Sequence, residues 1–438
     1  MYVLERSSWF SIRVNFLMLY NQSIFSFYQD KLMFVSMEPE QFQRDCALIR
    51  LGDVGHNGDT MAVFEGKSIG VYGGIPGELV EVDIFRYRRR KKDFIAGRVM
   101  RVIEPSEHRI PAPCPYFGAC SGCQWQHIDY SFQLELKRQL IKSSFKSYGG
   151  LRNIQIFDPL PSPDKFGYRN HARFTVRFGG QLGFSNRITR QFVSIQNCEI
   201  MAPGINDVLS ELQGKCGETT NLSVRVGIST GDKLIQPTLK SSLISTITGQ
   251  KWYLEEIKGR TFRVASPSFF QVNTKQAENL IDLVGDSLNV SDIDVLVDAY
   301  AGVGIFASTL ARRAKKVIAI EESHSAVEDA SEACADIENL EYIEGKTEDV
   351  LSELEDDVDA LILDPPRVGC HPAALEAVLN KKPQKIAYVS CDPKSLARDL
   401  DILVTGGYTV QGISPVDMFP QTYHVECVSN LNLEQKNT

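Results

Sequence analysis

The second half of the chain contains the pattern that most limits its possible folds. From about residue 266, short apolar runs alternate with stretches long enough to form helices. The runs are 295–297, 316–320, 360–363 and 386–389. Buried strands that alternate with helices are typical of a parallel sheet covered on both faces. We therefore expect an α/β fold with a doubly wound, largely parallel sheet in this region.

The residues before this region predict two smaller domains. Between Asp45 and Ile103, short strands of alternating hydrophobicity and glycine turns indicate a small β-barrel. The next segment combines a proline-rich connection, cysteines, a helix near 130–148 and mixed strands, which indicates an α+β domain. We expect the three domains to span residues 41–105, 106–262 and 263–438.

Residues 1–40 have no place in this scheme. They are rich in aromatic residues, lack a clear period, and contain Met33 and Met37 as further candidate starts. We interpret the segment as an over-extended reading frame, with a partner-docking arm as the alternative.

The net charge of −8 conceals an uneven distribution. From Arg263 to the end there are 14 basic and 30 acidic residues, whereas residues 1–262 hold 33 basic and 25 acidic ones. Such a distribution suits an enzyme whose first part binds a polyanion, although chance drift between domains is an alternative. Six cations surround Tyr87 in the stretch 86–92, which indicates a hairpin tip that contacts nucleic acid or, alternatively, a solvated turn.

Composition excludes several classes of protein. Hydrophobic residues make up 43% and charged residues 23% of the chain, which is not typical of a disordered or collagen-like protein. Ten cysteines in 438 residues are too few for a disulfide scaffold. No apolar run reaches the roughly eighteen residues of a membrane span, and no signal peptide is evident. We expect a cytoplasmic protein without membrane contact or an obligate protein partner.

A glycine turn after the first apolar run predicts a nucleoside site. Residues 298–304 include Gly302 and Gly304 and lead into a helix, so the backbone there can approach a ligand closely. Glu321 closes the next run, where a carboxylate can accept both ribose hydroxyls. No third glycine stands near Ser308, which favours S-adenosylmethionine over a dinucleotide such as NAD.

Two further apolar runs end in residues that could take part in catalysis. Asp364 begins Asp-Pro-Pro-Arg, where an aspartate argues against methylation of an exocyclic amine and can accept from a ring N–H. Cys391 follows the next run and is a candidate nucleophile, with a buried small residue as the alternative. A thiolate that adds to carbon 6 of uracil would activate carbon 5, and Glu426 would then supply the base that removes the carbon 5 proton.

Four cysteines form a candidate metal-binding set. They are Cys114, Cys120, Cys123 and, further along, Cys198. Soft thiolates in this number select zinc or an iron–sulfur cluster. The spacing alone leaves both open, together with a set of unligated cysteines.

These motifs together resemble the uracil-5 RNA methyltransferase family, in the branch with an N-terminal TRAM barrel and a [4Fe–4S] cluster. The resemblance covers about residues 45–431. The motifs that show the resemblance are the stretches 114–127, 167–170, 197–198, 269–273, 298–304, 364–367, 390–391 and 422–426.

The resemblance implies a role for each candidate residue. Gln271, Tyr300, Glu321 and Asp364 correspond to contacts with S-adenosylmethionine. Cys391 corresponds to the nucleophile and Glu426 to the base. Cys114, Cys120, Cys123 and Cys198 correspond to the ligands of the [4Fe–4S] cluster. The implied substrate is a uridine in structured RNA, with 23S ribosomal RNA favoured over transfer RNA. A weakly active RNA-binding assembly factor is the alternative function.

The chain also departs from the family pattern at four positions. They are Ala301, Ile305, Asp392 and Gln421. The first two remove a polar contact expected near the cofactor, and Gln421 replaces a frequent histidine next to Thr422. None of the four removes an essential group, so we expect an active enzyme.

Overall fold

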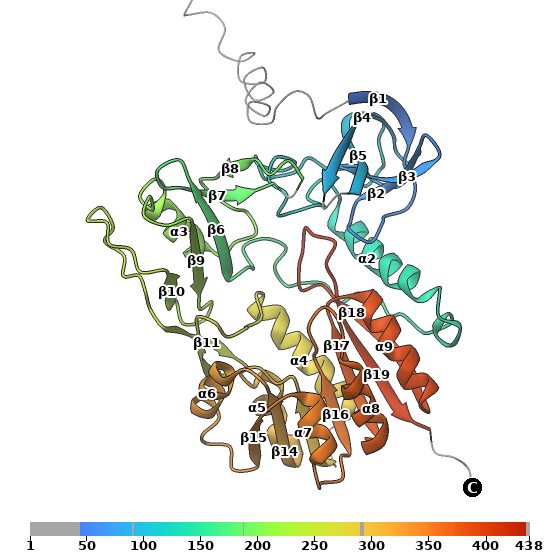
Figure 1. Cartoon of the computed structure of the whole chain (residues 1–438), viewed down its shortest axis with the longest axis vertical. Coiled ribbons are helices and arrows are strands. Elements are labelled where there is room, and N and C mark those ends of the chain that lie inside the picture. The colour runs from blue at the N-terminus through green and yellow to red at the C-terminus, as the bar shows by residue number, and fades with distance from the viewer. Residues whose placement is uncertain (1–43, 90–91, 187, 290–292, 435–438) are drawn as a thin grey trace, which may run out of the picture.

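The computed structural model describes residues 44–89, 92–186, 188–289 and 293–434. Three structured regions follow one another from the blue barrel, through the green central sheet, to the large orange and red α/β region (Figure 1). The expectation for residues 1–40 lies outside the described residues, as does that for the hairpin tip at 90–91. Within the described residues, no helix is long and apolar enough to cross a membrane.

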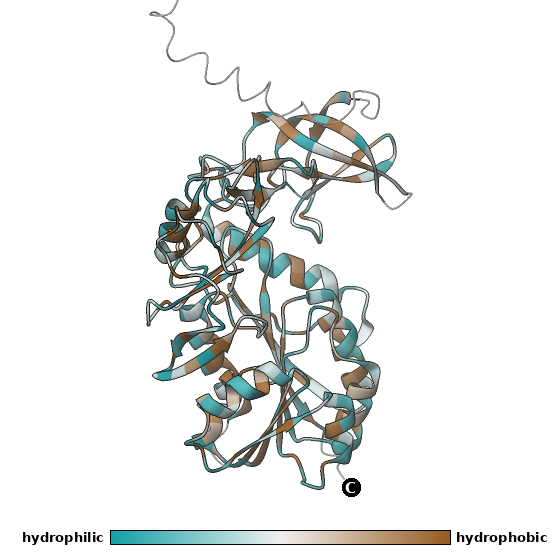
Figure 2. Ribbon diagram, turned by 60° about the vertical axis from the view of Figure 1, so that its left-hand side comes forward, coloured by the Kyte–Doolittle hydropathy of each residue, from teal (hydrophilic) through white to brown (hydrophobic). Residues whose placement is uncertain are grey.

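The first region is a curled sheet whose order is β1-β4-β5-β3-β2. Hydrophobic and hydrophilic residues are interspersed along its strands, as a sheet with one buried face requires (Figure 2). The buried side chains include Val71, Val80, Val82 and Ile84. The strands are β1 (Arg44–Arg50), β2 (Thr60–Phe64), β3 (Lys67–Tyr72), β4 (Leu79–Arg89) and β5 (Lys92–Glu104). This sheet confirms the expected small barrel architecture.

The central region has a second sheet, ordered β10-β9-β6-β7-β8. Helix α3 (Pro203–Leu212) packs its apolar side chains Ile205 and Leu209 against Phe174 and Val224 of this sheet. The strands are β6 (His171–Arg177), β7 (Gln181–Ser185), β8 (Phe192–Ser194), β9 (Asn221–Val226) and β10 (Lys233–Gln236). Strand β6 lies in the middle of the sheet, and its first residues face the cavity described below.

The last region is a seven-stranded sheet ordered β15-β14-β13-β16-β17-β19-β18. All pairs are parallel except those of β19, which runs antiparallel to both neighbours. The strands are β13 (Ile293–Ala299), β14 (Ala314–Glu321), β15 (Leu340–Glu344), β16 (Ala360–Leu363), β17 (Lys385–Ser390), β18 (Tyr408–Val416) and β19 (Glu426–Leu433). The four expected apolar runs are β13, β14, β16 and β17, so the doubly wound α/β fold is confirmed.

Helices cover both faces of this sheet, each with its own apolar core. One core joins α4 and α5 to the sheet, and the other joins α8 and α9 to its opposite face. The helices are α4 (Thr274–Leu288), α5 (Ile305–Leu310), α6 (His324–Ala333), α7 (Thr347–Glu353), α8 (Pro372–Lys381) and α9 (Pro393–Thr405), with short 3-10 turns at η2 (Gly149–Leu151) and η3 (Ala311–Arg313).

Two segments from earlier in the chain pack on this last region. Helix α2 (Tyr130–Phe145) places Ile141 and Phe145 in the core beside α9. The hairpin of β11 (Trp252–Ile257) and β12 (Arg260–Ala265) packs in the core on the α4 side. The expected boundary at residue 262 therefore lies inside β12, and the division into domains stays a prediction.

Candidate active site

A cavity of about 1340 Å³ opens at the carboxyl ends of β13, β14, β16 and β17. Every candidate site residue lines it. They are Cys114, Cys120, Cys123, Cys198, Gln271, Tyr300, Glu321, Asp364, Cys391 and Glu426. In open α/β sheets ligands bind at this edge, so the fold brings residues far apart in sequence to the place where a ligand is expected.

The glycine turn forms one wall of the cavity. Gly302 and Gly304 have φ values of 56° and 84°, and Tyr300 has an uncommon positive φ of 69°. A Cβ on Gly304 would lie 2.0 Å from the Tyr342 hydroxyl oxygen, so only glycine fits there. The Gly302 N–H donates to Glu321 Oε2 at 2.8 Å, which fixes this carboxylate beside the turn.

Asp298, at the end of β13, is a buried acid that the sequence did not single out. Its Oδ2 accepts from the Ala307 N–H at 2.9 Å, and within the described chain its buried Oδ1 has no hydrogen-bond partner. Burial raises the pKa of Asp298 to about 8, with further contributions from Asp364 and Glu321. Its place between a strand and a glycine turn was the only sequence signal.

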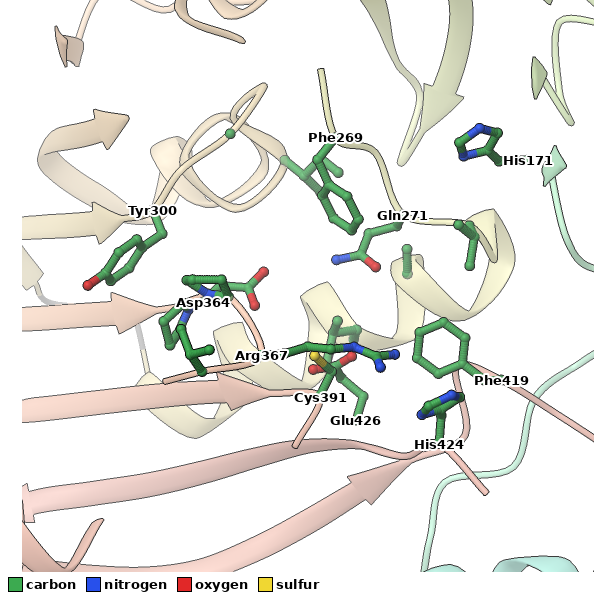
Figure 3. A pocket seen from close by; sticks show the side chains of 18 of the residues that line it. His171, Phe269, Gln271, Tyr300, Asp364, Arg367, Cys391, Phe419, His424 and Glu426 are labelled. Atoms are coloured by element: carbon green, nitrogen blue, oxygen red, sulfur yellow. The ribbon is translucent and has the colours of Figure 1, made fainter. Parts of the chain in front are cut away.

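The register of β17 and β19 brings the candidate nucleophile and base together. Ser390 pairs with Cys427 in this antiparallel pair, so the next positions, Cys391 and Glu426, lie at the same end of both strands. The two side chains point into the same part of the cavity (Figure 3). Burial, and next the charge of Glu426, raise the pKa of Cys391 to about 12. Burial and Asp364 raise the pKa of Glu426 well above its ordinary range.

Arg367 is a cation close to Cys391 and Glu426, and the sequence analysis assigned it no role. Its guanidinium extends toward Cys391 and Glu426 from the loop after β16 (Figure 3). It donates a hydrogen bond to Cys391, which lowers the pKa of that thiol, and its charge also lowers the pKa of Glu426. Burial raises the pKa of Asp364, three residues earlier, to about 7. The sequence signal for Arg367 was its position directly after Asp-Pro-Pro.

Gln271 enters the cavity from the opposite side, beside the exposed ring of Phe269 (Figure 3). Asn170 holds this segment, because its Nδ2 donates to the Gln271 carbonyl and to Thr274 Oγ1, both at 3.0 Å. The far wall includes Phe419 and side chains that the sequence did not assign. They are Arg169, His171, Arg173, Thr422 and His424.

The candidate metal ligands form a group of thiols at one end of the cavity. Burial raises the pKa of each, to about 12 for Cys123 and about 11 for Cys198, and the neighbouring thiols add to both shifts. Gln126 Oε1 accepts from the Cys114 N–H at 3.1 Å, and the same amide hydrogen-bonds to Cys123. Among the described residues, no three His, Cys, Asp or Glu side chains are arranged to hold a single metal ion.

One departure from the family pattern has a structural explanation. Asp392 caps α9, because its Oδ1 accepts from the N–H groups of Lys394 and Ser395 at 3.0 and 2.9 Å. It also lies 3.7 Å from His56 of the barrel. An aspartate at this position therefore stabilises a helix beside the nucleophile.

The fold and the site define a class I methyltransferase, the class of enzyme that uses S-adenosylmethionine. A family model described as tRNA (uracil-5-)-methyltransferase matches residues 247–434. An uncharacterized RNA methyltransferase of Gloeobacter violaceus is 33% identical over 85% of this chain and 93% of its own length. One of Bacillus cereus is 30% identical over 92% of this chain and 100% of its own. The chain belongs to this family of RNA methyltransferases that act on uracil carbon 5.

A solved structure supports the fold. The Pyrococcus abyssi tRNA (uracil-54, C5)-methyltransferase, in complex with S-adenosyl-L-homocysteine, superposes with a TM-score of 0.66 at 24% identity. The match covers 87% of this chain and 99% of that one. The expected fold class and the expected enzyme class are both confirmed.

Proposed function

We propose that this enzyme forms 5-methyluridine in 23S ribosomal RNA in the cytoplasm, through a covalent bond between Cys391 and carbon 6 of the target uridine. The observation that carries the proposal is the meeting of Cys391, Glu426 and Arg367 in the cavity that the glycine turn also lines. Ribosomal RNA is favoured because the chain combines a barrel with the cysteine group. Transfer RNA is the competing substrate, because the matching family model and the Pyrococcus enzyme carry its name.

The residues present fit S-adenosylmethionine. Gln271, Tyr300, Glu321 and Asp364 line the cavity and would hold it, and two of these four residues are acids. Acidic side chains favour a ligand that carries a sulfonium cation. When bound, S-adenosylmethionine supplies an electrophilic methyl group.

The protein side chains then act in a fixed order. The Cys391 thiolate adds to carbon 6, and the electron pair of the carbon 5–carbon 6 double bond moves toward the carbonyl, which makes carbon 5 nucleophilic. Once carbon 5 carries the methyl group, the Glu426 carboxylate accepts the proton from carbon 5. The double bond re-forms and Cys391 leaves as a thiolate, which Arg367 stabilises through its hydrogen bond.

The opposite end of the cavity is suited to RNA. His171 and Arg173 line it from the start of β6, where alternate residues of a strand share one face, and Arg169 lines it just before the strand. Burial lowers the pKa of His171 to about 3, so the two arginines provide the positive charge that phosphate requires. The exposed ring of Phe269 offers a surface on which a base can stack.

We also propose that Cys114, Cys120, Cys123 and Cys198 hold a [4Fe–4S] cluster with a structural role. Four partly buried thiols that influence one another are a donor set that soft metals prefer. Each of the four cysteines would supply one thiolate to such a cluster, which would tie the segment 114–123 to Cys198. Iron and sulfide analysis of anaerobically purified protein, beside a Cys123→Ser variant, tests this assignment.

The reaction is tested with anaerobically purified protein, S-adenosylmethionine that carries a labelled methyl group, and unmodified ribosomal or transfer RNA. Each RNA is digested to nucleosides for mass spectrometry. Labelled 5-methyluridine from ribosomal RNA is the expected result. Label only from transfer RNA would change the substrate, and label on another nucleoside would contradict the covalent mechanism.

A further inference from the structure

A buried polar contact holds the loop that leads to Glu426. Residues 417–425 connect β18 to β19, and Phe419, Thr422 and His424 of this loop line the cavity. The loop packs on α2, whose side chains at positions 130, 133 and 137 lie on one face of the helix. None of these three helix residues lines the cavity itself.

Gln133 pairs with Gln421 through both ends of its amide. Its Nε2 donates to Gln421 Oε1 at 3.0 Å, and its Oε1 accepts from the Gln421 N–H at 3.1 Å. The two side chains are 1% and 3% exposed, so water cannot replace these bonds. Gln421 has a φ of 68°, an unfavourable conformation that its surroundings must maintain.

Lys137 holds the start of the same loop. Its ammonium group donates to Asp417 and, at 3.1 Å, to the Phe419 carbonyl. Asp417 also accepts from the Tyr130 hydroxyl at 2.8 Å. Lys137 and Asp417 are fully buried, so this pair fixes one geometry.

The contact continues to the cysteine group. The Gln421 carbonyl accepts from the N–H groups of Gln124 and Trp125, both at 3.1 Å, and these residues follow Cys123 directly. The side chain of Gln421 therefore faces α2, while its carbonyl binds the cysteine segment. Gln421 therefore has a structural role between α2 and the cysteine segment.

We propose that Gln133 and Lys137 are positioning residues for methylation, which set the place of the 417–425 loop and therefore of Thr422 and Glu426. The proposal rests on the proposed function, because it assigns Glu426 the removal of the carbon 5 proton. A displacement of about 1 Å in a catalytic group can reduce the rate about 100-fold. Removal of these bonds should therefore slow the step that Glu426 performs more than it weakens RNA binding.

The test compares Gln133→Met, which removes the amide at nearly constant volume, with Gln139→Met on the exposed face of the same helix. Gln421→Met removes the side-chain bond of the pair from the loop side while its backbone N–H remains, and serves if the first variant does not fold. Three quantities are measured: kcat and KM for RNA, the amount of covalent RNA–protein adduct, and hydrogen exchange in peptides that span 417–426.

We expect Gln133→Met to lower kcat about 10- to 100-fold with little change in KM, to accumulate the adduct, and to exchange faster in the loop. Gln139→Met should match the wild type in kinetic constants, in the amount of adduct and in hydrogen exchange of the loop. Wild-type exchange in the loop of the folded variant, or lost activity without adduct, would overturn the proposal. If the wild-type enzyme makes no 5-methyluridine, the proposed function fails, and the exchange measurement alone decides whether Gln133 positions the loop.

Discussion

Arg367 offers the most direct way to change the chemistry of Cys391 without removing its sulfur. Its hydrogen bond and charge lower the pKa of Cys391, which burial and Glu426 raise to about 12. In Arg367→Met the thiol pKa should rise further, so a smaller fraction is thiolate at any given pH. We expect methylation and alkylation of Cys391 at pH 8 to slow about tenfold or more, and the rising part of the pH–rate profile to move to higher pH. Mass spectrometry of the Cys391 peptide measures the alkylation rate.

Arg367→Lys is the matched control, because it keeps the positive charge near the sulfur. It should retain more of the alkylation rate than Arg367→Met. Equal rates in the wild type and in Arg367→Met would show that the guanidinium does not influence the thiol.

The sequence identified the candidate residues, but it did not identify the contacts between them. Cys391 and Glu426 stand 35 positions apart, and only the antiparallel register of β17 and β19 shows that they meet. The motifs that carry the family resemblance identified both. Arg367 was part of a quoted motif, but its bond to Cys391 depends on the path of a loop, which no local pattern specifies.

Strand β13 carries a prediction on stability. The pKa of Asp298 is about 8 in the folded chain and near 3.8 without its burial. The folded state therefore binds the proton more tightly, and the free energy of unfolding should fall as pH rises from about 4 to about 8. Asp298→Asn removes this titration, so it should gain about 4 kcal/mol relative to the wild type between pH 5 and pH 8.5. Urea denaturation at both values measures the difference.

Asp294→Asn, on the exposed side of the same strand, is the control and should follow the wild-type pH dependence. An Asp298→Asn variant with the same pH dependence as the wild type would contradict the assignment of a buried, protonated acid.

The turn after β13 predicts a difference between its two glycines. Gly302→Ala meets no atom within 4 Å and adds only backbone strain, whereas Gly304→Ala also places a methyl group against the Tyr342 hydroxyl. We expect Gly304→Ala to lose about 2–4 kcal/mol of stability and most of its S-adenosylmethionine affinity, and Gly302→Ala to lose less. Thermal unfolding and calorimetric titration measure the two effects.

Tyr342→Phe removes the clashing oxygen and should restore part of the stability of Gly304→Ala. If the double variant is no more stable than Gly304→Ala, the contact with Tyr342 is not the cause.

The strands of the last sheet show which structural features the hydrophobic pattern predicts and which it does not. The largely buried strands β13, β14, β16 and β17 were predicted from their apolar runs. Strand β15 was not, because Leu340–Glu344 is only half buried and has no continuous apolar run. The reversed direction of β19 was also missed, since hydrophobicity does not encode strand orientation.

The barrel, the central sheet and the last α/β region meet near the candidate nucleophile Cys391. The loop before β2 contacts both of the other regions, because the Trp125 indole N–H of the central region donates to the Gly58 carbonyl at 2.9 Å and Gly58 packs on Tyr423 of the last region. The basic first part of the chain therefore lies next to the acidic domain that holds the reacting groups. Both parts of the chain line the cavity, with Arg169 and Arg173 from the basic part and Glu321, Asp364 and Glu426 from the acidic part.

RNA affinity should accordingly depend on salt and on the barrel. We expect RNA to bind at least tenfold more weakly at 200 mM than at 50 mM salt. Replacement of Arg88 and Arg89, in the basic stretch 86–92, by Gln should weaken RNA binding and reduce the salt slope by about one for each phosphate that the barrel no longer neutralises. Arg86→Gln is the matched control, because Arg86 is already paired with Asp45 and Glu65 at 2.7 and 2.9 Å. A salt slope that is the same in all variants would exclude the barrel from RNA binding.

The covalent mechanism is tested most directly in the Glu426→Gln variant. This variant is incubated with RNA and S-adenosylmethionine, the products are digested, and mass spectrometry locates any nucleotide on the protein. We predict a methylated uridine attached to Cys391, because the thiol can add but the carbon 5 proton cannot be removed. The Cys391→Ala/Glu426→Gln double variant should show none. Free 5-methyluridine at the wild-type rate, or bound RNA without an adduct on Cys391, would contradict the mechanism.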